Sequence, residues 1–228
     1  MKNVFTYGIL LGLCLLATIT GAQDKGWYEG KITLASNQTL AGLISFNWDG
    51  DVVQVRLTDG RIRAFSPAQV QTFTWATSTK SARVFGAFPV PAKALGHQSR
   101  HPDRLVFLET HLTGHYPVFR RMQKKHGFLY IRPKRPGNVA NQQDFAGDRD
   151  HFDYFVYDGK AFRNLFYFYR DIEPLMADYQ PTLDEFARAH QLNLREPMAQ
   201  LMLIDRYNQL KAAELKGKTD FIDTLSAQ

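Results

Sequence analysis

Between residues 27 and 88, short runs of hydrophobic and β-branched residues alternate with short polar breaks. Runs of this length, bounded by turn-forming residues, are typical of β-strands. In one run Val53, Val55 and Leu57 share one face and polar side chains occupy the other, which predicts a sheet with one solvated face. The predicted strands are residues 31–34, 43–46, 52–57, 61–65, 72–75 and 83–88.

Two of the breaks, Asp49-Gly50 and Asp59-Gly60, predict tight hairpin turns. Asp followed by Gly suits a two-residue connection in which both central residues have positive φ angles. Short strands joined by such turns favour an antiparallel β-meander or a small SH3-like barrel. We therefore expect residues 23–88 to form a small barrel-like β module.

A second group of predicted strands follows a polar connector with Pro and Gly, residues 89–103. Residues 133–149 are rich in Pro, Gly, Asn, Gln and Asp, which predicts a long loop. We expect the whole of residues 104–165 to form a second antiparallel β region. Its predicted strands are residues 105–112, 116–121 and 128–132, then a hairpin of residues 152–157 and 160–165 around Asp158-Gly159.

The pattern becomes helical in residues 166–228, which we expect to cap the sheet. Thr182 and Glu185 have the spacing of a capping box, and Asn193 suits the left-handed residue after a helix. Further helices are expected over residues 171–177 and from Pro197 to Lys216, with Gly217 ending the last one. The predicted fold class is α+β: a meander or small barrel, further antiparallel strands and a helical C-terminal cap.

The first residues have the pattern of a cleavable secretory signal. Lys2 precedes an apolar run, residues 4–20, and the small residues Gly21 and Ala22 follow it. A membrane anchor is the alternative, although the run is near the lower limit for spanning a bilayer. We expect residues 1–22 to be removed, which leaves no transmembrane segment in the mature chain.

Cysteine usage adds to the prediction of export. The only cysteine, Cys14, lies within the predicted signal, so the mature chain is expected to contain no thiol and no disulfide. A secreted eukaryotic domain of this size usually carries disulfides, so their absence favours a bacterial envelope. The expected location is the periplasm, the outer membrane or the medium of a Gram-negative cell.

The net charge of +6 is concentrated between residues 120 and 135, a stretch with several cations and no acid. Such a segment attracts anions, and export argues against nucleic acid as the partner. The expected partner is an anionic envelope component or another envelope protein, and a solvated hairpin without a ligand is the alternative. The predicted ligand-binding residues are Arg120, Arg121, Lys124, Lys125, Tyr130, Arg132, Tyr154 and Tyr157.

Aromatic residues crowd the stretch from Phe152 to Tyr169, with rings on both faces of the predicted hairpin. Each face needs a cover, because large exposed apolar patches are rare on soluble proteins. We expect the C-terminal helices to provide it; a partner, a lipid surface or a sugar stacked on tyrosine rings are alternatives. Any rings left exposed predict a tyrosine-lined groove beside the basic segment.

Metal or catalytic chemistry has little support in the sequence. His97 and His101, and likewise His111 and His115, are spaced four residues apart, but both pairs fall in predicted loops or strand ends rather than on a helix. The acidic residues 144–153 do not follow the EF-hand pattern. Neither a nucleophile elbow nor a phosphate loop occurs. No cofactor is expected.

Two short segments carry a resemblance to a known group of proteins. Residues 29–34 read EGKITL and residues 38–44 read QTLAGLI, a G-x-I, turn, T-L-x-G-x-I pattern. This pattern resembles the opening of uncharacterised exported proteins of Gram-negative bacteria, and residues 65–73 and 104–109 continue the likeness. The resemblance implies an N-terminal β module and implies no activity. The sequence thus predicts an exported, non-catalytic binding or envelope-associated protein; the alternative is a hydrolase of envelope glycans or lipids without a recognisable motif.

Overall fold

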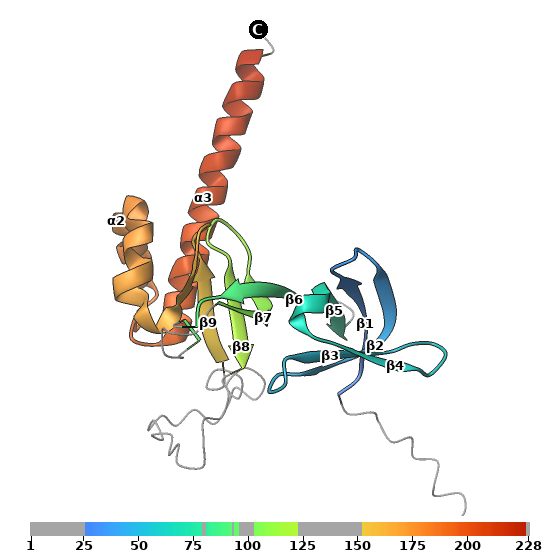
Figure 1. The fold of residues 1–228 in the computed structure, drawn as a ribbon. Coiled ribbons are helices and arrows are strands. Elements are labelled where there is room, and N and C mark those ends of the chain that lie inside the picture. The colour runs from blue at the N-terminus through green and yellow to red at the C-terminus, as the bar shows by residue number, and fades with distance from the viewer. Residues whose placement is uncertain (1–25, 79–80, 93, 96–102, 123–151, 227–228) are drawn as a thin grey trace, which may run out of the picture.

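Ten strands form one antiparallel sheet in the computed structural model, which describes residues 26–78, 81–92, 94–95, 103–122 and 152–226 (Figure 1). The strand order is β10-β9-β8-β7-β6-β5-β1-β2-β3-β4, so β1 lies between β2 and β5. Both predicted β regions share this sheet. The strands are β1 Tyr28–Leu34, β2 Thr39–Asn47, β3 Val52–Arg56, β4 Ile62–Phe65, β5 Val70–Ser78, β6 Ser81–Val90, β7 Arg104–Leu112, β8 Val118–Met122, β9 Phe152–Tyr157 and β10 Phe162–Asn164.

The sheet is open rather than closed into a barrel. Strand β5 pairs with β1 on one side and with β6 on the other, so it offers no free edge to β4. Within the described residues β4 pairs with β3 alone, and the 3₁₀ turn η1 (Pro67–Gln69) leads from it into β5. The antiparallel α+β class is confirmed, and no ladder closes the first strands into a barrel.

The predicted strand positions are confirmed wherever the structure describes the chain, but the predicted turn geometry is wrong. Asn47 pairs with Val52, so four residues connect β2 to β3 instead of two. The positive φ falls on Asp51, at 54°, and the Asn47 side chain accepts the backbone N–H of Gly50 at 3.0 Å. The second turn has its positive φ at Gly60 only. The predicted strand 128–132 lies outside the described residues.

The glycines of the G-x-I and T-L-x-G-x-I segments, Gly30 and Gly42, have a steric role in the sheet. Gly30 and Gly42 are directly paired across β1 and β2. A Cβ on Gly30 would lie 2.1 Å from the carbonyl oxygen of Thr74, and one on Gly42 would lie 2.3 Å from that of Arg56. Both distances are far below van der Waals contact, so only glycine allows the backbones to approach this closely.

Gly42→Ala is therefore expected to destabilise the fold by about 2–3 kcal/mol, because the added methyl group meets backbone rather than a movable side chain. Urea denaturation of the purified variant measures the loss. Gly50→Ala is the matched control, since its Cβ meets only the Asn47 side chain at 3.6 Å. Equal stability of the two variants would contradict the close-approach argument.

Among the described residues, three hydrophobic clusters hold the sheet and helices together. The first lies on the N-terminal strands around Phe73, Phe85 and Phe107. The second lies between β8, β9 and the helices, and Trp48 of the β2–β3 turn packs against both of these clusters. The third contains Phe155 and occupies the opposite face of β7, β8 and β9, because side chains alternate along each strand.

The expected burial of the aromatic hairpin under the helices is confirmed for one of its two faces. Phe152 and Tyr154 of β9 pack in the second cluster with Leu201, Ile204 and Tyr207 of the last helix. On the other face, Phe155 and Phe162 are buried in the third cluster. Three rings remain outside both clusters and are exposed to solvent: Phe166, Tyr167 and Tyr169.

The C-terminal segment is helical as predicted, but both helix starts and ends differ in detail. Short turns η2 (Leu165–Tyr167), η3 (Phe168–Ile172) and η4 (Glu173–Tyr179) lead into α2 (Gln180–Ala189) and α3 (Pro197–Ser226). Thr182 is not the N-cap, because Pro181 occupies the first turn, where its missing N–H is not needed. The left-handed residue after α2 is Gln191, with φ of 51°, instead of Asn193.

Helix α3 also continues past Gly217, where it was predicted to end. A glycine inside a helix costs only about 1 kcal/mol relative to alanine, which does not stop a helix already under way. Figure 1 shows the C-terminal part of α3 extending away from the sheet. Among the described residues, no helix combines the length and apolar content that spanning a bilayer requires.

Helix α3 is attached to the sheet by a buried amide. Asn208 accepts the backbone N–H of Tyr116 at 2.8 Å and donates to the carbonyl oxygen of the same residue at 3.0 Å. Its Nδ2 also lies 3.4 Å from the carbonyl oxygen of Thr113. These bonds fix the β7–β8 hairpin against the helix, while the Tyr116 and Tyr207 rings stack with centroids 5.3 Å apart.

Candidate functional site

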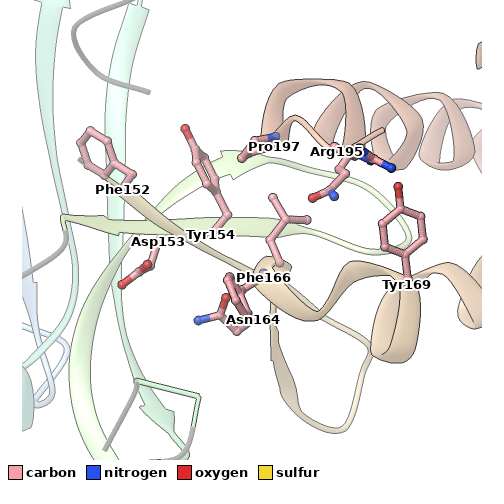
Figure 2. A pocket seen from close by; sticks show the side chains of 10 residues that line it. Phe152, Asp153, Tyr154, Asn164, Phe166, Tyr169, Arg195 and Pro197 are labelled. Atoms are coloured by element: carbon pink, nitrogen blue, oxygen red, sulfur yellow. The ribbon is translucent and has the colours of Figure 1, made fainter. Parts of the chain in front are cut away.

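A pocket of about 330 Å³ lies where the aromatic hairpin meets the start of α3 (Figure 2). The first residues of β9 form one wall, and the β10–η3 segment and the α2–α3 connection form the others. This volume is at the lower end of the range for small-molecule sites. Figure 2 shows Phe152, Asp153 and Tyr154 on one side, and Tyr169 and Arg195 on the other.

The exposed aromatic rings at this pocket result from the local helical turns. Leu165 and Phe168 are buried, and a 3₁₀ turn repeats every three residues, so the residues around them point outward. Phe166 is 85% exposed and Tyr169 is 52% exposed, and both line the pocket. The next turn, η3, is a π-helical turn, a feature that often occurs at functional sites.

Asn164 holds this aromatic segment in place. Its Oδ1 accepts the backbone N–H of Phe166 at 2.9 Å, and its Nδ2 donates to the carbonyl oxygen of Ala94 at 3.0 Å. The first bond caps the turn, and the second ties it to the segment that follows β6. The Phe166 ring is therefore displayed by a braced backbone rather than by an unsupported loop.

Polar groups of both signs complete the pocket. Arg195 is exposed, and its guanidinium has no hydrogen bond or ion pair to the part of the chain that the structure describes. Gln200 is buried and donates its Nε2 to the carbonyl oxygen of Leu194 at 2.8 Å, which leaves Oε1 as an acceptor. Asp153 also lines the pocket. The pocket thus offers a cation, hydrogen-bond acceptors and aromatic faces.

The structure describes four of the predicted ligand-binding residues and does not bring them into one site. Tyr154 lines the pocket, whereas Tyr157 packs at 5.0 Å against Phe162 on the other face of the sheet. Arg120 and Arg121 are successive residues of β8 and so face opposite sides. Lys124, Lys125, Tyr130 and Arg132 lie outside the described residues.

Arg120 belongs to a buried charge cluster between the first and second hydrophobic clusters. Glu109 lies between Phe85 and Arg120 in the sheet register. Its carboxylate accepts two hydrogen bonds from Arg83, at 2.8 and 2.6 Å, and two from Arg120, at 2.8 and 3.0 Å. The Arg120 guanidinium also lies over the Phe152 ring at 4.4 Å.

This arrangement keeps Glu109 ionised. Burial by itself raises the pKa of the Glu109 carboxyl, but the hydrogen bonds and charges of Arg83 and Arg120 outweigh that effect and hold the pKa below its usual value. The neighbouring His111 has a lowered pKa, caused first by burial and then by the charge of Arg120. The Glu109 carboxylate is therefore engaged by two arginines inside the fold.

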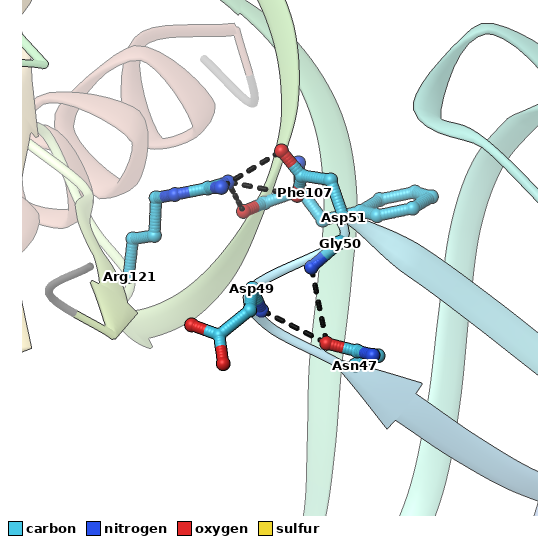
Figure 3. Close-up of polar contacts among 6 residues, drawn as sticks. All are labelled: Asn47, Asp49, Gly50, Asp51, Phe107 and Arg121. Carbon is cyan, nitrogen blue, oxygen red and sulfur yellow. Dashed lines mark hydrogen bonds and ion pairs between the residues drawn. The ribbon is translucent and has the colours of Figure 1, made fainter. Parts of the chain in front are cut away.

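Arg121 belongs to a second buried pair, on the other side of β8 (Figure 3). Its guanidinium donates to both carboxylate oxygens of Asp51, at 2.8 and 2.7 Å, and to the carbonyl oxygen of Phe107 at 3.2 Å. Asp51 in turn accepts the backbone N–H of Phe107 at 3.3 Å. The β2–β3 turn thereby satisfies backbone groups of β7.

A second, wider hollow lies over β1, β2 and β3, with a volume of about 690 Å³. Gly30 and Gly42 contribute backbone to its lining, and its one cation, Arg56, stacks on the Trp27 ring at 4.4 Å. Its lining therefore lacks the exposed rings and unpaired guanidinium of the first pocket. In the described residues, no three His, Cys, Asp or Glu side chains gather as a metal site requires.

Several pocket residues could not be predicted from the sequence. Arg195 and Gln200 belong to no motif, and only the α2–α3 connection brings them to the hairpin. Phe166 and Tyr169 belong to the aromatic run, but nothing in the run distinguishes the outward rings from the buried ones. Comparisons with protein families, with curated proteins and with solved structures find no match to this chain.

Proposed function

We propose that this protein is an exported, non-catalytic binding protein of the Gram-negative cell envelope, and that the pocket beside the aromatic hairpin holds its ligand. The observation that carries the proposal is the combination of two exposed rings, Phe166 and Tyr169, with the guanidinium of Arg195, which has no partner among the described residues, at one concave site. Aromatic rings and a few convergent polar groups are the usual composition of a ligand site.

Binding is favoured over hydrolysis by the state of the carboxylates. Hydrolysis of a glycosidic bond generally needs two carboxylates across a cleft. Glu109 and Asp51 are each engaged by arginines inside the fold, and the pocket lining contains the carboxylate of Asp153. A pocket with one acid and an arginine is better suited to hold a ligand than to cleave it.

Export and the resemblance to exported envelope proteins belong to the same proposal. They are supported by the signal-like pattern of residues 1–22 and by the G-x-I and T-L-x-G-x-I segments, whose glycines have the steric role described above. We further propose an SH3-like arrangement for β1 to β5. In its support, Phe65 of β4 and Val70 of β5 share one hydrophobic cluster, and η1 connects their strands.

One experiment tests export and binding together. The full chain is expressed in a Gram-negative host, recovered from the envelope fraction and measured by native mass spectrometry. We expect a polypeptide that begins at Gln23 and carries a bound compound of defined mass. Tyr169→Ala is expected to lose most of this compound, because the exposed ring supplies a contact face. Tyr28→Ala, which removes a similarly exposed ring outside the pocket, is expected to retain it.

The outcomes separate the alternatives. A chain recovered only from the cytoplasm with residues 1–22 attached contradicts export. Equal retention of the compound by both variants contradicts the pocket. Incubation of the purified protein with the identified compound leaves the mass of that compound unchanged if the protein only binds, whereas a decrease that corresponds to cleavage favours the hydrolase alternative.

A further inference from the structure

We propose that the pocket selects an acidic sugar, a pyranose ring that carries one carboxylate and several hydroxyl groups. This inference rests on the proposed binding function and names the chemical class of the ligand. It follows from the aromatic ring, the cation and the hydrogen-bond acceptor that line one site, Tyr169, Arg195 and Gln200.

The exposed rings determine the shape of the ligand. The face of an aromatic ring is negative and its edge positive, so it attracts the weakly positive C–H groups on one face of a pyranose. Tyr169 is half exposed at the pocket, and Phe166, which also lines it, is almost fully exposed. Because Leu165 and Phe168 are buried and Asn164 braces the turn, the backbone that carries these rings is held in place before a ligand arrives.

The charges determine which sugar is preferred. Arg195 presents a guanidinium without a described partner, and it precedes Pro197, the first residue of α3. The positive end of the α3 dipole therefore adds to the charge of the arginine, and both favour an anionic group on the ligand. A planar guanidinium matches a carboxylate in a bidentate geometry.

A hydrogen-bond acceptor in the pocket favours hydroxyl groups on the same ligand. The Oε1 of Gln200 accepts hydrogen bonds, which hydroxyl groups donate. A ligand with an acid group and several hydroxyl groups engages both Arg195 and Gln200, whereas a polyphosphate, which offers acceptors alone, engages only Arg195.

The test measures the affinity of the purified mature protein for matched sugars by isothermal titration calorimetry. The acidic probes are digalacturonic acid, a glucuronic-acid disaccharide and an N-acetylmuramic-acid disaccharide. Galactobiose, which has CH₂OH in place of each carboxylate of digalacturonic acid, is the neutral control, and inorganic phosphate tests for simple anion binding. We expect at least one acidic probe to bind about tenfold more tightly than its neutral counterpart, as one charge-assisted hydrogen bond provides.

The variants assign this preference to the pocket. Arg195→Gln is expected to weaken acidic-sugar binding about tenfold and to abolish the preference over the neutral sugar. Arg104 is an exposed arginine outside the pocket, so Arg104→Gln is expected to leave the affinity and the preference unchanged. Tyr169→Ala is expected to weaken both sugars, and Tyr169→Phe, which keeps the ring, to retain binding.

Three results with the sugar probes overturn the inference. They are the failure of all three acidic probes to bind, equal affinity for acidic and neutral sugars, and an Arg195→Gln variant that weakens both equally. If the acidic probes fail while the compound recovered from the envelope still depends on Tyr169, the binding function stands and only the sugar assignment falls. If the acidic probes fail to bind and no compound from the envelope binds at the pocket, both proposals fail. Binding of phosphate as tightly as of the acidic sugars identifies a general anion site and also overturns the assignment.

Discussion

Asp51→Asn is expected to lower the free energy of unfolding by about 3–5 kcal/mol, the usual effect of breaking a buried ion pair. The substitution keeps the size of the side chain and tolerates the left-handed backbone at this position, where φ is 54°. It removes the charge that compensates the Arg121 guanidinium, whose side chain is only 7% exposed. Urea denaturation followed by circular dichroism measures the loss.

The control for Asp51 is the same substitution at Asp59, which lies in the next hairpin turn and pairs with Arg61. The Arg61 side chain is 78% exposed, so water compensates its charge and the denaturation midpoint should not move measurably. The double variant Asp51→Asn with Arg121→Met is expected to recover much of the stability, because it removes the stranded charge. A double variant as unstable as the single one would show that the charge is not the cause.

Glu109→Gln is the second substitution with a large expected effect, a loss of about 3 kcal/mol in the free energy of unfolding. It removes the carboxylate that Arg83 and Arg120 share between two hydrophobic clusters. The expected loss is at the lower end of the range for buried pairs, because the Arg83 side chain is 28% exposed and partly hydrated. The same denaturation experiment measures it.

The pH dependence of stability tests the Glu109 cluster independently. The pKa of Glu109 is lower in the folded protein than its ordinary value of 4.5, so the folded state is favoured by the ionised carboxylate. This contribution is complete above pH 4.5 and is lost as the pH falls through the lower folded-state pKa. The stability difference between wild type and Glu109→Gln should therefore shrink below pH 4.5. A difference that is constant with pH would contradict it.

Pocket function and fold stability are expected to respond to different substitutions. Asp51 and Glu109 are buried in the fold and do not line the pocket, whereas Tyr169 and Arg195 are exposed there. Replacing Tyr169 or Arg195 should change ligand binding while leaving the denaturation midpoint nearly unchanged, since surface substitutions usually have small effects on stability. This separation lets a loss of binding be distinguished from a loss of folding.

Local patterns predicted the elements of this fold well. Alternation of apolar and polar residues located the described strands, because a strand with one buried face imposes that period on its own sequence. The aromatic hairpin and its helical cover were predicted for the same reason, since rings on both faces require burial on both. Helix ends and turn types were predicted less well, as at Thr182, Gly217 and Asp51, where neighbouring structure outweighs local preference.

The cationic run that begins at Arg120 shows most clearly that the sequence pattern does not determine the role of a charged residue. Arg120 and Arg121 appear in the sequence as part of a cationic run, yet the structure places each against its own buried carboxylate. Their partners, Glu109 and Asp51, are 11 and 70 residues away along the chain. Distant residues become neighbours only when the strands pair, so a charge count along the sequence cannot distinguish a surface cation from a structural ion pair.

The sequence by itself determined the antiparallel α+β class, the strand positions, the helical C-terminal segment and the need to bury an aromatic hairpin, because each depends on residues close together in the chain. The tertiary structure alone decided that the sheet stays open, that two arginines neutralise Glu109, and that Arg195 meets Tyr169 at a pocket. These features arise from contacts between segments far apart in sequence, and their geometry is fixed only once the sheet and helices have packed.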